Sequence, residues 1–311
     1  MQVFRHIPQQ KCAPLALAIG NFDGMHLGHQ ALLAWLTEAS KAKNLTPAVM
    51  AFEPHPREFF APQNAPVRLT TLREKLEYFA EANIEKVFIC AFNQAFAQIS
   101  ANDFMQNILR EKLNANTILV GEDFKFGAKR QGSVDDFREH NFDLITLPEV
   151  SVGQHRVSST MVRNALAAGD LAQATTLLGR PYSISGKVVH GAQRGRQLGF
   201  PTANVYMRHE RPALTGVYTV KLSVGQLDGL NAVANLGVRP TIAGVPKLLL
   251  EVHVIDYAGD LYGKHVHVQF LQKLREEMKF ESLDALKTQI AKDVEVAKDF
   301  FNVIASDSEA I

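Results

Sequence analysis

The chain has 311 residues, 46% of them hydrophobic, which is enough for two ordinary cores and argues against disorder. Its 33 Lys and Arg nearly balance its 32 Asp and Glu, so nucleic acid is not an expected partner, and no apolar run approaches the ~20 residues that cross a bilayer. With this balanced charge, small molecules are the expected substrates. Two isolated cysteines, Cys12 and Cys90, and the lack of an apolar signal core in residues 1–11 favour a cytoplasmic protein.

The first part of the chain reads as an α/β domain. Apolar runs alternate with helical patterns up to about residue 180, which predicts a doubly wound parallel sheet wrapped by helices. Strands are expected at residues 15–19, 48–52, 87–92, 117–120 and 144–147. A helix is expected at 30–42. A second is expected to begin at a capping box of Thr71 and Glu74 and to end at residue 82, and a third to begin at Ser100, capped with Asp103, and to end at residue 112.

The pattern changes after Gly179-Arg180-Pro181, so the expected domains are 1–180 and 181–311. Short apolar runs at 182–190, 217–224, 232–236, 248–255 and 265–271 predict a small antiparallel β-barrel. A final helix is expected from Ser282, with an apolar stripe of Leu283, Leu286, Ile290, Val294, Ala297 and Phe301 packed on the barrel, and with a frayed tail at 305–311.

The strongest candidate site is residues 20–29 (GNFDGMHLGH), between the first strand and the first helix. Free N–H groups and the positive end of the helix dipole at a helix start bind anions, and triphosphate is a common ligand there. His26 and His29 are three residues apart, so both rings lie on one face and can reach one phosphate. A metal pair and two surface histidines are the alternatives, although no recognisable zinc pattern of Cys, Asp or Glu accompanies them.

Residues 20–29 resemble the G-x-F-D-G-x-H-x-G-H signature of prokaryotic FAD synthetases, which are His-x-Gly-His nucleotidyltransferases with a Rossmann-like domain. Segments 52–56 (FEPHP), 120–127 (VGEDFKFG) and 156–163 (RVSSTMVR) resemble further motifs of that family. Ser158 or Ser159 is expected to cap a helix that carries Arg163 in its first turn. The resemblance implies catalytic residues His26, His29 and Arg163, nucleotide-binding residues Gly20, Phe22, Asp23, Gly24, Gly28, Ser159 and Thr160, and flavin-binding residues Asn21, His55, Pro56, Asp123 and Phe124.

A second candidate site is residues 191–204 (GAQRGRQLGFPTAN), where glycines allow close backbone approach and two arginines bring charge for a phosphate. A flexible hairpin loop is the alternative. The segment PTAN resembles a riboflavin kinase motif in which Thr202 and Asn204 hold Mg²⁺, a cation that prefers oxygen ligands. The resemblance implies that Gly191, Arg194, Gly195, Arg196, Thr202 and Asn204 bind the nucleotide.

Glu251 lies in an apolar strand and is the candidate for the carboxylate that accepts a substrate proton, the alternative being an outward-facing strand acid. Its segment resembles the E-x-H-x-x-D-x-x-x-D-L-Y-G-K run of riboflavin kinases, whose Glu is the catalytic base. Residues 235–241 and 274–280 resemble the N-x-G-x-R-P-T and L-R-x-E-x-x-F runs, and the second implies flavin contacts at Arg275 and Phe280.

Taken along nearly the whole chain, the resemblance is to bifunctional riboflavin kinase/FMN adenylyltransferases. It implies a transferase that makes FMN from riboflavin and ATP in its second domain and FAD from FMN and ATP in its first, with Mg²⁺ for both steps. A class I aminoacyl-tRNA synthetase is disfavoured because no Lys-Met-Ser-Lys-Ser-like loop is present. Two alternatives stay open: a flavin-binding module without turnover, and a nucleotidyltransferase that acts on another phosphorylated acceptor.

Overall fold

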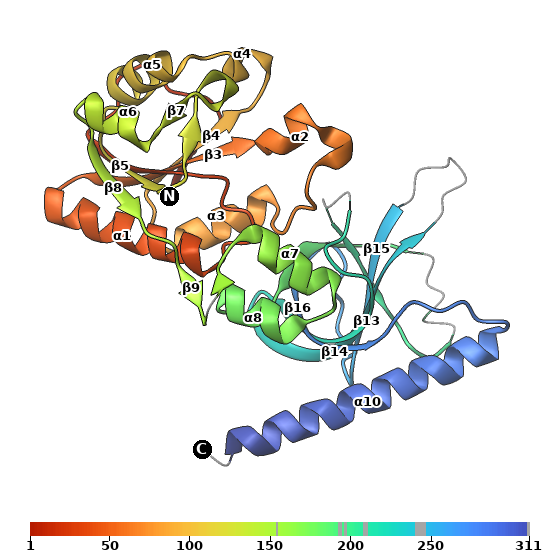
Figure 1. Cartoon of the computed structure of the whole chain (residues 1–311). Helices are drawn as coiled ribbons and strands as arrows, with labels where there is room; N and C mark the ends of the chain where they lie inside the picture. The colour runs from red at the N-terminus through yellow and green to blue at the C-terminus, as the bar shows by residue number, and fades with distance from the viewer. Residues whose placement is uncertain (154, 192–194, 196–197, 208–210, 240–246, 310–311) are drawn as a thin grey trace. The chain divides into compact units, whose positions relative to one another are not determined.

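The computed structural model describes residues 1–153, 155–191, 195, 198–207, 211–239 and 247–309 (Figure 1). The chain forms two compact units, Met1–Ser159 and Thr160–Ile311. The boundary between the units falls at the first residue of α7 (Ser159–Ala167), so the rest of α7 and α8 (Leu171–Leu178) precede the barrel in the second unit. The sequence prediction placed the domain boundary after residue 180. No helix in the described part of the chain is long and apolar enough to cross a membrane.

The first unit contains the predicted doubly wound sheet. Its six strands are all parallel and lie in the order β1 (Gln2–Phe4), β4 (Lys86–Ala91), β3 (Thr46–Glu53), β2 (Leu15–Ile19), β5 (Ala115–Gly121) and β8 (Asp143–Leu147). The strand order reverses at β2, and such reversal points are where open α/β sheets bind ligands. Strand β1 was not predicted, because three residues at a sheet edge are too few to show a period.

Alternate side chains of β2 enter two different cores, which is why this strand is apolar without interruption. Leu15, Leu17 and Ile19 pack under the helix η2 (Phe104–Lys112) and α6 (Val134–Glu139). Ala16 and Ala18 pack under α1 (Leu27–Lys43) and α3 (Leu72–Glu81) on the opposite face, as Figure 1 shows.

The helix starts agree with the capping residues predicted from the sequence. Thr71 caps α3, where the Thr71 N–H donates to Glu74 Oε2 at 2.6 Å and the Glu74 N–H donates to Thr71 Oγ1 at 3.3 Å. Ser100 caps α5 (Ala101–Asp103), which continues into η2 with the wider hydrogen-bond spacing of a π-helix. The remaining short elements are α2 (Pro56–Phe60), η1 (Pro62–Asn64), α4 (Gln94–Ala97), β6 (Lys125–Phe126), η3 (Ala128–Arg130), β7 (Gly132–Ser133), β9 (Ser151–Val152) and β10 (His155–Arg156).

The second unit is the predicted antiparallel barrel. It closes in the order β11 (Ser183–Val189), β12 (Ala203–Tyr206), β15 (Lys247–Val254), β14 (Leu227–Arg239), β13 (Gly216–Val224) and β16 (His265–Arg275). All five predicted strands are present, and β12 is additional. It was not recognised because it has only four residues and begins inside a glycine- and proline-rich segment.

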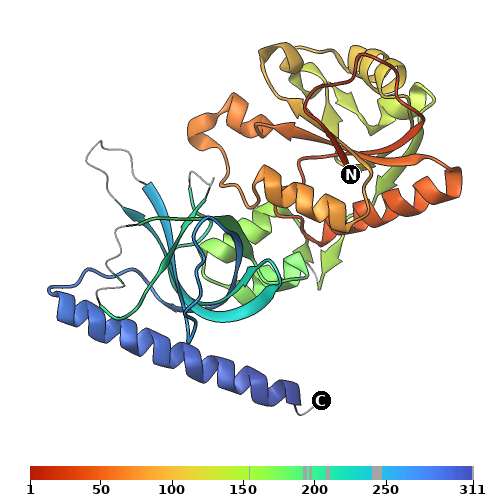
Figure 2. The ribbon, with the colours of Figure 1, turned by 180° about the vertical axis from the view of Figure 1, so that it is seen from behind.

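Helix α10 (Leu283–Glu309) runs along the outside of the barrel in both views (Figure 2). Val294, Ala297 and Phe301 pack against Val217 and Val233 of the barrel. The predicted stripe is wrong at its first turn, since Leu283 is 68% exposed there. The predicted frayed tail is also wrong up to residue 309, because the helix continues through Glu309.

Candidate active sites

The turn at the carboxyl end of β2 has an unusual backbone. Phe22, Gly24 and Met25 adopt φ angles of 51°, 84° and 45°, in the left-handed region that side chains disfavour. A Cβ on Gly24 would lie 2.7 Å from Leu69 Cδ1, so this position requires glycine. The Phe22 side chain is fully buried against Phe79, which leaves only its backbone to face a ligand. Strain of this kind is found at functional sites.

The two predicted histidines lie together at the start of α1. Their rings stack with centroids 3.7 Å apart and an interplanar angle of 19°, which confirms that they share one face. Helix α1 has no side-chain cap at His26 and no acidic residue in its first turn, so its N-terminus keeps the character of an anion site.

The surroundings of His29 disfavour its charged form. Burial lowers the pKa of His29 well below its ordinary value, and the positive charges of His26 and Lys75 act in the same direction. Within the described residues, its Nδ1 atom is buried and has no hydrogen-bond partner. A phosphate oxygen at this position would supply one.

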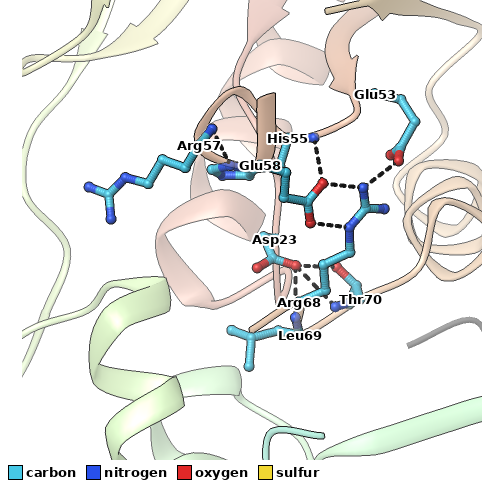
Figure 3. A network of polar contacts seen from close by, with 8 residues as sticks. All are labelled: Asp23, Glu53, His55, Arg57, Glu58, Arg68, Leu69 and Thr70. Carbon is cyan, nitrogen blue, oxygen red and sulfur yellow. Dashed lines mark hydrogen bonds and ion pairs between the residues drawn. The ribbon is translucent and has the colours of Figure 1, made fainter. Parts of the chain in front are cut away.

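Asp23 fastens the turn to residues 68–71. Its Oδ1 accepts from the N–H groups of Leu69 and Thr70, each at 3.0 Å, and from Thr70 Oγ1 at 3.2 Å (Figure 3). Ser159 Oγ donates to the Asp23 carbonyl oxygen at 2.8 Å, so the structure brings these two predicted nucleotide-binding residues together. Thr160 and Arg163 follow Ser159 along α7. Arg163 lies in the second helical turn and not in the first, as the sequence predicted, because α7 begins at Ser159.

A second network holds the loop after β3, where His55 and Pro56 lie. Arg68 binds the Glu58 carboxylate through two nitrogens and Glu53 Oε1 at 2.6 Å. Glu58 also accepts from the His55 N–H at 3.0 Å, and His55 Nδ1 accepts from the Arg57 N–H at 3.1 Å. The sequence prediction did not include Arg68, because its partners, Glu53 at the end of β3 and Glu58 in α2, become neighbours of Arg68 only in the fold.

We expect Arg68→Met to lower the stability of the first unit by about 2 kcal/mol, because two half-buried carboxylates would lose their shared cation. For a unit of this size that is a fall of about 4–8 °C in Tm, measured by calorimetry. Arg57→Met is the matched control, since Arg57 is exposed and its guanidinium points away from the network in Figure 3. Equal Tm values for the two variants would contradict a stabilising role for the Arg68 network.

The loop after β5 carries two more predicted flavin-binding residues. Asp123 forms an ion pair with Arg156 at 2.8 Å, and Arg156 also contacts Glu149 at 2.7 Å. Phe124 is partly buried and stacks on Phe126, which belongs to the core. The Asp123 carboxylate is thus paired with a cation, and one face of Phe124 is already in contact with protein.

In the second unit, the barrel register brings Glu251 between two amides. Glu251 on β15 is opposite Asn204 on β12 and opposite Asn235 on β14. Leu250 and Val252 are fully buried in the barrel interior, so Glu251 and its two neighbours lie on the outer face. Within the described residues, Asn235 Oδ1 is buried without a hydrogen-bond partner. This row of a carboxylate and two amides can orient a hydroxyl group and accept its proton.

The predicted glycines pack directly against the predicted magnesium ligands. A Cβ on Gly191 would collide with the Asn204 side chain, and one on Gly195 would collide with the Phe200 carbonyl oxygen and lie 3.2 Å from Thr202 Oγ1. The structure therefore brings Gly191, Gly195, Thr202 and Asn204 together. Arg194 and Arg196, also predicted to bind the nucleotide, lie outside the described residues.

A cavity of about 510 Å³ lies between the end of β15, residues 199–201 and α10. His253 lines it, two residues beyond Glu251 on the same face of β15, and His253 Nδ1 is 2.9 Å from the Pro201 carbonyl oxygen. Arg275 is anchored to α10 through Asp293, with Nε–Oδ1 at 3.0 Å and an NH2–Oδ2 contact at 2.7 Å, and its guanidinium lies 5.7 Å from the Phe280 ring centroid. The predicted flavin residues Arg275 and Phe280 are thus in contact with each other.

Comparisons with known proteins give the same two-part division. Residues 8–161 match the FAD synthetase family and residues 178–301 match the riboflavin kinase family. The bifunctional riboflavin kinase/FMN adenylyltransferase of Escherichia coli K12 is 47% identical over 304 residues, covering 95% of both chains, and that of Haemophilus influenzae is 44% identical, covering 97% of this chain and 100% of the relative. A crystal structure described as a macrolide-efflux protein of Streptococcus pneumoniae superposes with a TM-score of 0.81, at 29% identity over 96% of this chain and 98% of its own.

Proposed function

Since the chain belongs to the family of bifunctional riboflavin kinase/FMN adenylyltransferases, we propose that residues 1–180 carry out the adenylyl transfer of that family and residues 181–311 its kinase reaction. The protein phosphorylates riboflavin with ATP to give FMN and ADP, and transfers AMP from ATP to FMN to give FAD and pyrophosphate. The division is supported by one observation above all: the stacked histidines belong to one compact unit, and the row of Asn204, Glu251 and Asn235 belongs to the other.

For adenylyl transfer, an FMN phosphate oxygen forms a bond to the α-phosphorus of ATP while the bond from that phosphorus to pyrophosphate breaks. The attacking phosphate is already ionised, so the site has to align it and stabilise the charge that develops. In our proposal His26, His29 and the α1 N-terminus bind the ATP phosphates, together with the backbone of 20–28 and with Ser159, Thr160 and Arg163. Asn21, His55, Pro56, Asp123 and Phe124 contact FMN.

For the kinase reaction, Glu251 accepts the proton of the riboflavin 5′-hydroxyl as that oxygen bonds to the γ-phosphorus and ADP leaves. Asn204 and Asn235 are paired with Glu251 on the two adjacent strands and orient the groups around it. The loop from Gly191 to Arg196 binds the ATP phosphates, and Arg275 and Phe280 contact the flavin. The cavity beside His253 provides room for a substrate.

Mg²⁺ fits the oxygen donors near Glu251. Thr202 directly precedes β12 and Asn204 is its second residue, so the two positions are on the same side of the extended chain. Gly191 and Gly195 approach these two side chains so closely that a Cβ at either glycine would crowd them. We propose that these two residues hold the ion, which would neutralise charge on the ATP phosphates. We also propose a cytoplasmic location, supported by the two free cysteines and by the use of ATP in both reactions.

Incubation of the purified protein with riboflavin, ATP and Mg²⁺, followed by chromatography over time, is expected to show FMN that rises first and FAD that follows. EDTA in excess over Mg²⁺ should stop both steps, because both use ATP, whose phosphate charge the ion neutralises. Unchanged riboflavin would point to a flavin-binding module, and FMN without FAD would point to another acceptor for the first unit. Full activity in EDTA would contradict the magnesium proposal.

A further inference from the structure

Lys75 on α3 is a buried lysine that the sequence prediction did not include. Only 3% of its surface is exposed, although an isolated ammonium is among the costliest groups to bury. Its backbone N–H donates to the Thr71 carbonyl oxygen at 3.0 Å. Its ammonium makes no hydrogen bond and no ion pair with any other residue that the structure describes.

The surroundings of Lys75 connect the two networks of the first unit. The charges that act on it belong to Asp23, Glu53, Arg68 and Glu58, and its own charge acts on His29. Burial lowers the pKa of Lys75, and the carboxylates of Asp23 and Glu53 oppose that shift in part. The packing agrees, because Phe79, one turn after Lys75 on α3, lies 5.1 Å from the Phe22 ring, and the Phe22 ring lies 5.3 Å from that of His29. Lys75 therefore lies on the same buried side of α3 as the contacts to the stacked histidines.

The neighbouring carboxylates are engaged by other donors. Glu53 and Glu58 both bind Arg68, and Asp23 accepts from Leu69 and Thr70. None of the three is close enough to Lys75 to form an ion pair with it, so a buried ion pair does not explain why a lysine occupies this position. Within the described residues, His29 Nδ1 is buried and has no hydrogen-bond partner. Two unsatisfied polar groups beside one anion-binding turn indicate a place for a ligand oxygen.

We propose, on the basis of the adenylyl-transfer function proposed above, that the Lys75 ammonium binds a substrate phosphate oxygen beside His26 and His29. A fixed charge in a poorly hydrated site interacts strongly with a phosphate and needs no reorganisation during the reaction. In the free protein the same charge adds to the burial that lowers the pKa of His29. When an anionic phosphate enters, it satisfies the ammonium and the imidazole together.

The test compares Lys75→Met and Lys75→Arg with the natural protein. We expect kcat/KM for FAD formation to fall about 10²-fold in Lys75→Met and to recover to within about tenfold of the natural protein in Lys75→Arg, which restores the charge. FMN formation from riboflavin should be the same in Lys75→Met, Lys75→Arg and the natural protein. An unchanged rate shows that each variant is folded and active. Arg73→Met is the matched control on the exposed side of the same helix, and should form FAD at the natural rate.

Two further measurements separate phosphate binding from packing. Lys75→Met should raise the unfolding temperature of the ligand-free first unit, because it removes a buried charge, and should reduce the additional rise caused by saturating pyrophosphate. In Lys75→Met the pKa of His29, measured by NMR, should rise toward its ordinary value, because the positive charge of Lys75 is gone. FAD formation within threefold of the natural rate in Lys75→Met, or an unreduced pyrophosphate effect, would overturn the inference. A natural protein that forms no FAD at all would instead contradict the proposed function.

Discussion

Glu251→Gln is expected to lower FMN formation by about 10³-fold, a loss typical of removing a general base. The amide keeps the size of the side chain and its place between Asn204 and Asn235, but it cannot accept the proton of the riboflavin hydroxyl. The conversion of added FMN to FAD should continue at the natural rate, because the stacked histidines lie in the other compact unit. Separate assays with riboflavin and with FMN as the flavin substrate measure the two rates.

Asp299→Asn is a suitable control for the Glu251 variant. It removes one negative charge from the same unit, at an exposed position of α10, and should leave both rates unchanged. If Glu251→Gln retained FMN formation within tenfold, Glu251 would not be the base. If it lost both activities equally, the assignment of the two reactions to separate units would be wrong.

His29→Asn is expected to reduce FAD formation from FMN by about 10²–10³-fold, the usual cost of removing one donor that stabilises charge in a transition state. The imidazole stacks on His26 and contacts the buried Phe22, and an amide would reproduce neither contact. FMN formation from riboflavin should be unaffected, so the variant should accumulate FMN. A chromatographic time course started from riboflavin measures both effects in one experiment.

His6→Asn is the control for the His29 variant, because His6 is exposed in the same unit and is not part of the proposed site. It should form FAD at the natural rate. If His29→Asn retained FAD formation, the proposed role of His29 in adenylyl transfer would be wrong. The His26 and His29 pair would then be ordinary residues at a helix start. A fall in FMN formation that matched the fall in FAD formation would again contradict the two-site assignment.

Local patterns were sufficient for most of the fold. The five strands of the first unit that were predicted are mostly apolar runs. Thr71 and Glu74, which cap α3, are only three residues apart, so short-range chemistry specifies both the strands and the cap. Strands β1 and β12 were not recognised, since three or four residues show no period and their pairing partners, β4 and β15, come much later in the chain. The first turn of α10 was wrongly expected to be buried, because a helical stripe does not reveal where the packed surface ends.

The sequence by itself determined the fold class of each part, the family, and the two motifs around which the candidate sites are built, because these depend on residues close together in the chain. Only the tertiary structure decided which distant groups meet them. Arg68 reaches Glu53 across a loop, and the charge of Lys75 acts on His29. Asn204, Glu251 and Asn235 become neighbours through strand register alone. Burial is likewise a property of the packed chain, and burial is what lowers the pKa of His29. It also encloses Lys75, whose ammonium has no ion-pair partner among the described residues.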